Sequence, residues 1–129
     1  MKIFVALISV LIFSLPTMAF DGATYFKKNC SSCHTIGEGD RTGPDLAGLS
    51  KRRKVDWIVK FVNYPSGMIN GDPEEAGYEK ADPIAKKLFK AYKPNMMPET
   101  EMDKKQVKAL LKYIDAQKKS PKGKILSIK

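Results

Sequence analysis

The sequence has very little of the two side chains that most often bind metals. Its 129 residues include two cysteines and one histidine. A zinc site made of Cys and His alone is excluded because such sites take four ligands, and a disulfide-rich scaffold is excluded because it takes several cysteine pairs. No second histidine is available for acid–base chemistry, and no residue set supports hydrolysis or group transfer. The sequence therefore predicts a protein that is not an enzyme and has no catalytic residues.

The two cysteines and the histidine lie together in the run Cys30-Ser31-Ser32-Cys33-His34. Cys-x-x-Cys-His is the spacing of c-type haem attachment, in which both thiols form thioethers and the histidine reaches the iron. A dithiol redox site has similar spacing, but it usually lies beside a strand–helix–strand pattern that residues 20–40 lack. A structural disulfide would leave His34 idle, and a zinc site would need added carboxylates. The run predicts one covalent haem c, bound by Cys30, Cys33 and His34.

The N-terminal segment predicts export. Lys2 precedes an apolar run over residues 3–15, Pro16 ends the run, and Ala19 is a small residue suited to signal peptidase. The run is shorter than the ~20 residues of a membrane span, which favours a cleaved signal over 1–19 rather than an anchor. Haem is ligated to such proteins outside the cytoplasm. We therefore expect a periplasmic bacterial protein with no stable membrane insertion.

Basic residues outnumber acidic ones, 23 to 14, and give a formal charge of +9. A small basic exported protein can bind nucleic acid, an anionic membrane or an acidic protein. The lysines are not interleaved with aromatic side chains, which disfavours nucleic acid. Residues 20–118 suffice for one domain, and the lysine-rich residues 119–129 predict a loose basic tail. We expect a monomer.

Two helices are predicted at the ends of this domain. Asp21 can cap a helix that begins near Gly22 and leads into the haem motif. Residues 106–118 contain apolar side chains at helical spacing and no Gly or Pro, and Asp103 is a plausible cap. Two amphipathic helices in a small domain bury their apolar faces most simply against each other. The apolar positions of the second helix are Val107, Leu110, Leu111 and Ile114.

At these motifs the chain resembles the class I cytochromes c. Gly22-x-x-x-Phe26 and Leu110-x-x-Tyr113 are similar to the family's crossed terminal helices, and the run from Gly43 to Gly48 is similar to its Gly-Pro-x-Leu-x-Gly loop. The resemblance implies an all-α fold around one haem. It also implies that the Pro44 carbonyl accepts the Nδ1–H of His34, which would fix the ring orientation.

The resemblance further implies a methionine as the second axial ligand. Family members carry it in a Met-Pro turn before the last helix, and Met97-Pro98 matches that turn. Met96 is the nearest alternative, since a shift of one residue changes which sulfur faces the iron. Met68 and Met102 are expected to be packing or surface residues.

The middle of the chain predicts two more helices. Residues 55–64 are apolar-rich and end at Pro65, and Trp57 is expected to pack at the haem edge or to bond a haem propionate. Asp82-Pro83 opens the second helix, with Ile84, Leu88 and Ala91 on one side. This arrangement resembles bacterial cytochromes with an extra helix before the methionine. Turns are expected between Pro65 and Asp82, and three glutamates there are expected to form a solvated face.

These features predict a one-electron carrier, because both axial positions of a His/Met haem are occupied. An electron-relay subunit of a periplasmic oxidoreductase is the alternative, and a gas sensor that releases Met97 is a third. Redox partners with acidic docking surfaces would match the positive charge. The basic run 51–54 follows the Gly-Pro loop, so it is either a docking rim or an ordinary solvated helix start.

Overall fold

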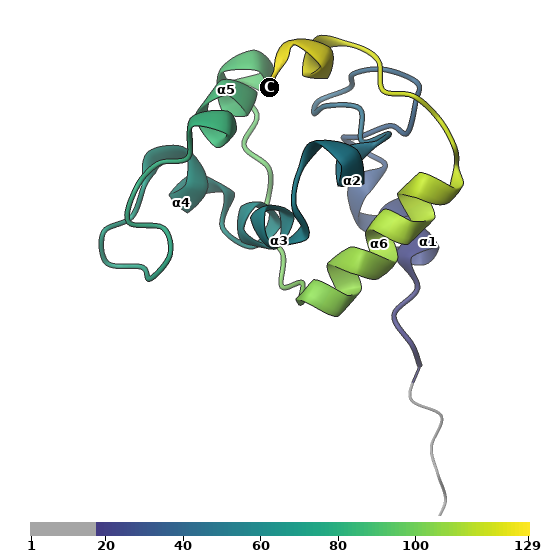
Figure 1. Cartoon of the computed structure of the whole chain (residues 1–129), viewed down its shortest axis with the longest axis horizontal. Coiled ribbons are helices and arrows are strands. Elements are labelled where there is room, and N and C mark those ends of the chain that lie inside the picture. The colour runs from purple at the N-terminus through teal and green to yellow at the C-terminus, as the bar shows by residue number, and fades with distance from the viewer. Residues whose placement is uncertain (1–17) are drawn as a thin grey trace, which may run out of the picture.

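The computed structural model describes residues 18–129, so the predicted signal over 1–19 lies almost entirely outside the described residues. The predicted all-α class is confirmed, since no strand occurs within 18–129 (Figure 1). None of the helices described there is long and apolar enough to cross a membrane. The helices are α1 (Gly22–Tyr25), the π-helix η1 (Phe26–Cys30), α2 (Leu49–Arg52), α3 (Val55–Asn63), α4 (Pro65–Asn70), α5 (Pro83–Tyr92), α6 (Lys104–Ala116) and the 3-10 helix η2 (Lys124–Ser127).

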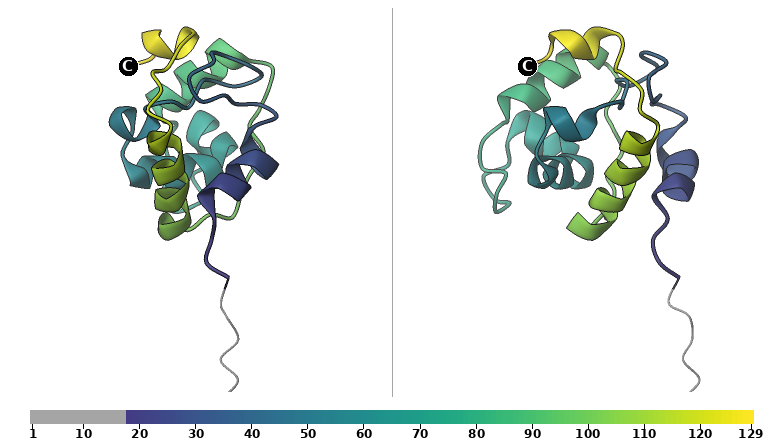
Figure 2. Two further views of the ribbon diagram at one scale, coloured as in Figure 1. Left: turned by 90° about the vertical axis from the view of Figure 1, so that its right-hand side faces the viewer. Right: turned by 45° about the vertical axis from the view of Figure 1, so that its right-hand side comes forward.

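The first and last long helical segments cross in direct contact, as predicted. Asp21 caps α1 by accepting from the N–H groups of Ala23 and Thr24. A Cβ on Gly22 would lie 2.5 Å from the Ala109 carbonyl oxygen, so glycine allows the two backbones to meet. The rings of Phe26 and Tyr113 extend the contact, with centroids 5.8 Å apart. Both views in Figure 2 show α1 beside α6.

Helix α6 begins directly after its predicted cap Asp103, two residues before the predicted apolar pattern over 106–118. The Asp103 carboxylate accepts from the Gln106 N–H, and the Gln106 side chain accepts from the Asp103 N–H. The four apolar residues predicted to face inward are buried. They pack with Phe26, Ile58 and Met102 in the main core of the described chain.

Helices α3, α4 and α5 form the other half of the molecule. The boundaries of α3 agree with the prediction to one residue, and Asp82 caps α5 with Pro83 in its first turn. Helix α4 was not predicted, since Gly67 indicated a turn there. Gly67 lies inside the helix because a side chain would collide with the ring of Tyr64. Met68 is buried between α4 and α5, in agreement with a packing role.

The C-terminal segment is packed rather than loose. Residues 118–129, which we call the strap, run from the end of α6 across the haem-motif loop to the last turn of α5 (Figures 1 and 2). Ile125 and Ile128 are buried with Tyr92 at the far end of the strap. The five lysines of the strap led its composition to predict a loose tail. Its two isoleucines, three residues apart, were the sequence feature that indicated packing.

Candidate functional site

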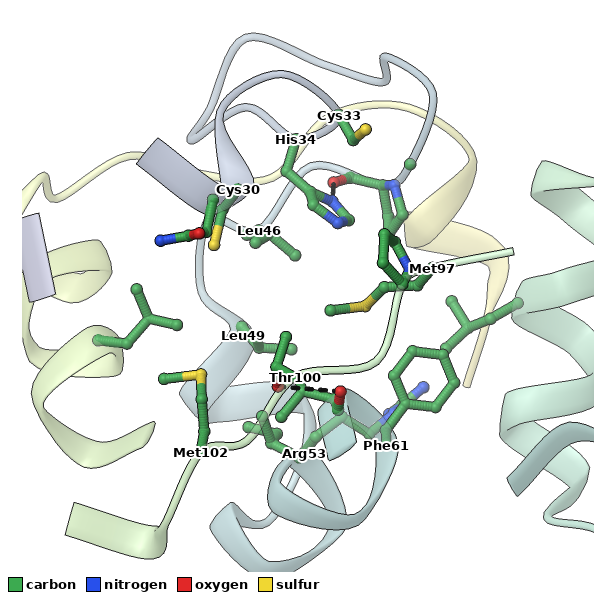
Figure 3. Close-up of a pocket in the computed structure, with 18 of the residues that line it drawn as sticks. Cys30, Cys33, His34, Leu46, Leu49, Arg53, Phe61, Met97, Thr100 and Met102 are labelled. Atoms are coloured by element: carbon green, nitrogen blue, oxygen red, sulfur yellow. Dashed lines mark hydrogen bonds between the residues drawn. The ribbon is translucent and has the colours of Figure 1, made fainter. Parts of the chain in front are cut away.

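A cavity of about 500 Å³ opens between the helices, within the size range of cofactor sites. Figure 3 shows His34 reaching into it from the haem-motif turn, and Met97 and Met102 from the chain between α5 and α6. Most of its wall is apolar, which favours a flat hydrophobic ligand and disfavours water. The apolar side chains include Leu46, Leu49, Phe61, Val62, Ile69, Leu88, Phe89, Leu110, Leu111 and Ile114.

The cysteines and the histidine meet at the end of η1. The N–H groups of Cys33 and His34 both donate to the Cys30 carbonyl, at 3.1 and 2.9 Å, which closes a tight turn. This turn brings all three side chains to one wall of the cavity (Figure 3). Burial, and then the neighbouring Cys33, raise the pKa of Cys30 to about 11. A dithiol redox site needs a nucleophilic thiol of lowered pKa, so the raised pKa of Cys30 disfavours that role for this thiol.

The His34 ring is fixed on both sides by the Gly-Pro loop. Its Nδ1 lies 2.8 Å from the Pro44 carbonyl oxygen, which can only accept, so Nδ1 carries the proton. Burial lowers the pKa of His34, while the bond to Pro44 acts in the opposite direction. A Cβ on Gly43 would lie 2.5 Å from His34 Cε1, so only glycine leaves room for the ring. The neutral imidazole therefore has Nε2 available to a metal.

Asp45 shapes this loop, and sequence reasoning missed it. Its side chain is fully buried. One oxygen accepts from the N–H groups of Gly37 and Ala47 at 2.7 and 2.9 Å. The other accepts from Gly39 and Lys122 at 2.9 and 3.1 Å. Burial raises the pKa of Asp45, but these four bonds outweigh it and leave the pKa below its usual value. The sequence feature that could have indicated this role is an acidic residue between Pro44 and Leu46, inside the Gly-Pro loop.

The methionine segment, residues 93–99, borders the cavity opposite the haem motif. Met97 directs its thioether into the cavity, whereas Met96 also reaches the wall but is 40% exposed. Met102 is buried in the core and contributes a further sulfur to the wall. Asn63 holds the Met102 backbone, since its amide accepts from the Met102 N–H and donates to the Met102 carbonyl, both at 2.8 Å.

Trp57 lines the cavity and carries a buried, unpaired hydrogen-bond donor. Its ring stacks on Phe61 with centroids 5.1 Å apart, and the Arg53 guanidinium lies 5.6 Å from the Trp57 ring centroid. Among the described residues its buried Nε1–H has no acceptor. A buried donor without a partner is costly, so an acceptor on a bound group fits this position. A haem propionate would supply one, and the site therefore fits haem in its thiols, imidazole, apolar wall and polar edge.

The basic run 51–54 is not a uniform charged surface. The Arg52 guanidinium donates to the carbonyls of Ala47 and Asp45, and the Arg53 guanidinium donates to the Ile128 carbonyl. Both arginines line the cavity. Lys51 and Lys54 are exposed. Reversing the arginine charges would disturb these internal bonds, so the arginines are poor probes of docking.

A helical domain with crossed terminal helices, two thiols and an imidazole at an apolar cavity defines a c-type cytochrome of class I. The sequence pattern of the family Cytochrome c matches residues 19–118. The chain belongs to this family. Its cofactor is covalent haem c, and the run Cys30–His34 fits the family's attachment motif.

Known cytochromes c are similar to this chain over parts of their length. A cytochrome c of Arabidopsis thaliana is 48% identical over 42 residues, which cover 31% of this chain and only 38% of that protein. The solved cytochrome c from Rhodothermus marinus has a TM-score of 0.58 and 27% identity, covering 74% of this chain and 72% of its own. The cytochrome c domain of the pp3183 protein from Pseudomonas putida has a TM-score of 0.55 and 29% identity, covering 75% and 87%.

Proposed function

We propose that this protein is an exported one-electron carrier whose haem iron is ligated by His34 and Met97. The observation that carries the proposal is that the His34 imidazole and the Met97 thioether enter the same cavity (Figure 3). Haem c supplies the one-electron chemistry. A His/Met pair raises its reduction potential and leaves no open position for a substrate.

The residues around the ligands have separate roles in this proposal. Cys30 and Cys33 form the thioethers, and Pro44 keeps the imidazole in the orientation and tautomer that bind iron. Trp57 Nε1–H donates to a propionate while its ring packs on Phe61. The apolar wall excludes water, which keeps the change in solvation on electron transfer small.

Electrons would enter and leave at the mouth of the cavity, the part of its lining that is exposed. Electron-transfer encounters are small and transient, so a compact surface of this kind suffices. Export to the bacterial periplasm is supported by the signal pattern over 1–19 and by covalent haem attachment. The mouth residues are Lys28, Asn29, Ser32, Thr42, Asn95, Met96, Pro98 and Glu99.

The ligand assignment is tested by visible spectroscopy of the oxidised holoprotein. A methionine sulfur bound to ferric iron gives a weak charge-transfer absorption at the red end of the spectrum. Met97→Ala is expected to abolish it and to lower the reduction potential. Met96→Ala and Met102→Ala are the matched controls and are expected to keep the absorption. Loss of the absorption in either control, with its retention in Met97→Ala, would move the ligand to that other methionine.

A further inference from the structure

The strap is bound to the haem-motif loop through two carboxylates. The Lys122 N–H donates to Asp45 at 3.1 Å, and the Lys124 N–H donates to Asp40 at 2.9 Å. Gly123, between them, has a φ of 90°, and a Cβ there would lie 2.5 Å from the Asp40 carboxyl carbon. The strap backbone therefore lies directly on the side chain of Asp40.

The same strap holds the last turn of α5. Ile125 and Ile128 bury against Tyr92, and the Lys124 ammonium donates to the Ala91 carbonyl at 3.0 Å. The Tyr92 hydroxyl donates to the second oxygen of Asp40 at 2.9 Å. Asp40 thus joins the haem-motif loop, the strap and the end of α5.

Tyr92 directly precedes the methionine segment, residues 93–99. Beyond that segment, Thr100 is fixed because its N–H donates to the Val62 carbonyl at 2.9 Å. Among the hydrogen bonds of the described chain, the one backbone bond made by 93–99 runs from Asn95 N–H to the Tyr92 carbonyl at 3.4 Å. The position of Met97 is therefore determined mainly by the two ends of its segment.

We propose that the strap positions Met97, because Asp40 and Ile128 fix Tyr92 and Tyr92 fixes the start of the methionine segment. The inference rests on the proposed function, since it takes Met97 as the sixth ligand. In the described chain neither Asp40 nor Ile128 lines the cavity, so both are positioning residues that act through Tyr92.

The test is an imidazole titration of the oxidised holoprotein, followed by the methionine–iron charge-transfer absorption. Imidazole can reach the iron only when Met97 leaves, so its apparent affinity scales with the fraction of molecules in which Met97 has left. Asp40→Ala and Ile128→Ala are each expected to tighten imidazole binding about tenfold, equivalent to about 1.4 kcal/mol. Tyr92→Phe removes one hydroxyl and keeps the packing, and it is expected to act in the same direction by about threefold.

Matched controls separate positioning from general destabilisation. Leu126→Ala changes a strap residue that is 59% exposed, and Glu38→Ala removes a carboxylate that is 63% exposed and pairs with the Lys119 ammonium of the strap. Both controls are expected to bind imidazole as wild type does. Lower resistance to denaturant with unchanged imidazole affinity in Asp40→Ala, Ile128→Ala and Tyr92→Phe would overturn the strap's role and leave the ligand assignment intact. Retention of the absorption by Met97→Ala would instead overturn the assignment itself.

Discussion

Asp45 determines the shape of the loop that orients His34. Its four backbone hydrogen bonds come from three residues of the loop and one of the strap. A folded-state pKa below the ordinary value of 3.8 means that Asp45 stabilises the fold above that pH. The contribution is lost as the pH falls through the folded-state pKa. Acid should therefore loosen the loop and the strap together.

We expect Asp45→Asn to lower the free energy of unfolding at pH 7 by about 2–4 kcal/mol. An amide can still accept on one oxygen, but its NH2 group would face two N–H donors. The loss, measured by denaturant titration, should shrink as the pH falls below about 4, because wild type loses the same interaction there. Asp56→Asn is the control: Asp56 also has a lowered pKa, caused first by a side-chain bond from Lys104, but it lies on the surface. An equal loss in both variants would contradict the argument.

The crossing of α1 and α6 depends on the absence of a side chain at Gly22. In an unpacked helix, Gly→Ala adds about 1 kcal/mol of stability through propensity. Here the added Cβ would meet the Ala109 carbonyl at 2.5 Å, and a backbone atom cannot move away as a flexible side chain can. The steric effect opposes the propensity and is the larger of the two.

Gly22→Ala should therefore destabilise the holoprotein by about 1–3 kcal/mol, the usual range for an overpacked site. Thermal unfolding followed by far-UV circular dichroism measures the change. Contact between Phe26 and Tyr113 should weaken with it, which near-UV circular dichroism reports. A variant as stable as wild type would mean that the two helices can separate at little cost.

Elements with an uninterrupted pattern were predictable, and those that depend on distant partners were not. Asp21, Asp82 and Asp103 each marked a helix start, because a cap acts on its own next three residues. Helix α4 was not predicted because its glycine, Gly67, indicated a turn. The glycine is there because a side chain would collide with the ring of Tyr64, which sequence spacing does not reveal. The packing of the strap was not predicted because its partners Asp40 and Asp45 lie about 80 residues earlier in the sequence. The proposed haem ligands lie in local sequence motifs, whereas the hydrogen bonds of Asp40 and Asp45 join residues that are far apart in the sequence.

The whole molecule is basic, and two lysines at or beside the mouth outweigh the one carboxylate of the mouth, Glu99, so the mouth should attract anions. Lys28 is an exposed residue of the mouth. Lys93 is also exposed and lies next to the mouth in the sequence, two residues before Asn95. Lys105 and Lys112 lie on the outer face of α6, opposite its buried residues. The two pairs carry the same charge, but neither lysine of the second pair lines the cavity.

Reversing Lys28 and Lys93 to Glu should slow oxidation by ferricyanide roughly tenfold at low salt, because a trivalent anion then meets repulsion at the mouth. Lys105→Glu with Lys112→Glu changes the net charge equally and should slow the reaction much less. Stopped-flow rates at increasing salt should converge, since the field is damped over ~8 Å at physiological ionic strength. Equal slowing by the two double variants would show that net charge alone acts and that the mouth is not the entry point.

The acidic loop between α4 and α5 gives the molecule an electric dipole. Residues 72–82 contain five of the fourteen carboxylates of the chain and one lysine. Figure 1 shows this loop projecting from the end of the molecule that is farthest from α1 and α6. A positive body with a negative end is a dipole, so an approaching charged surface exerts a torque as well as an attraction. The protein is therefore expected to turn before it touches, with the loop facing away from an anionic surface.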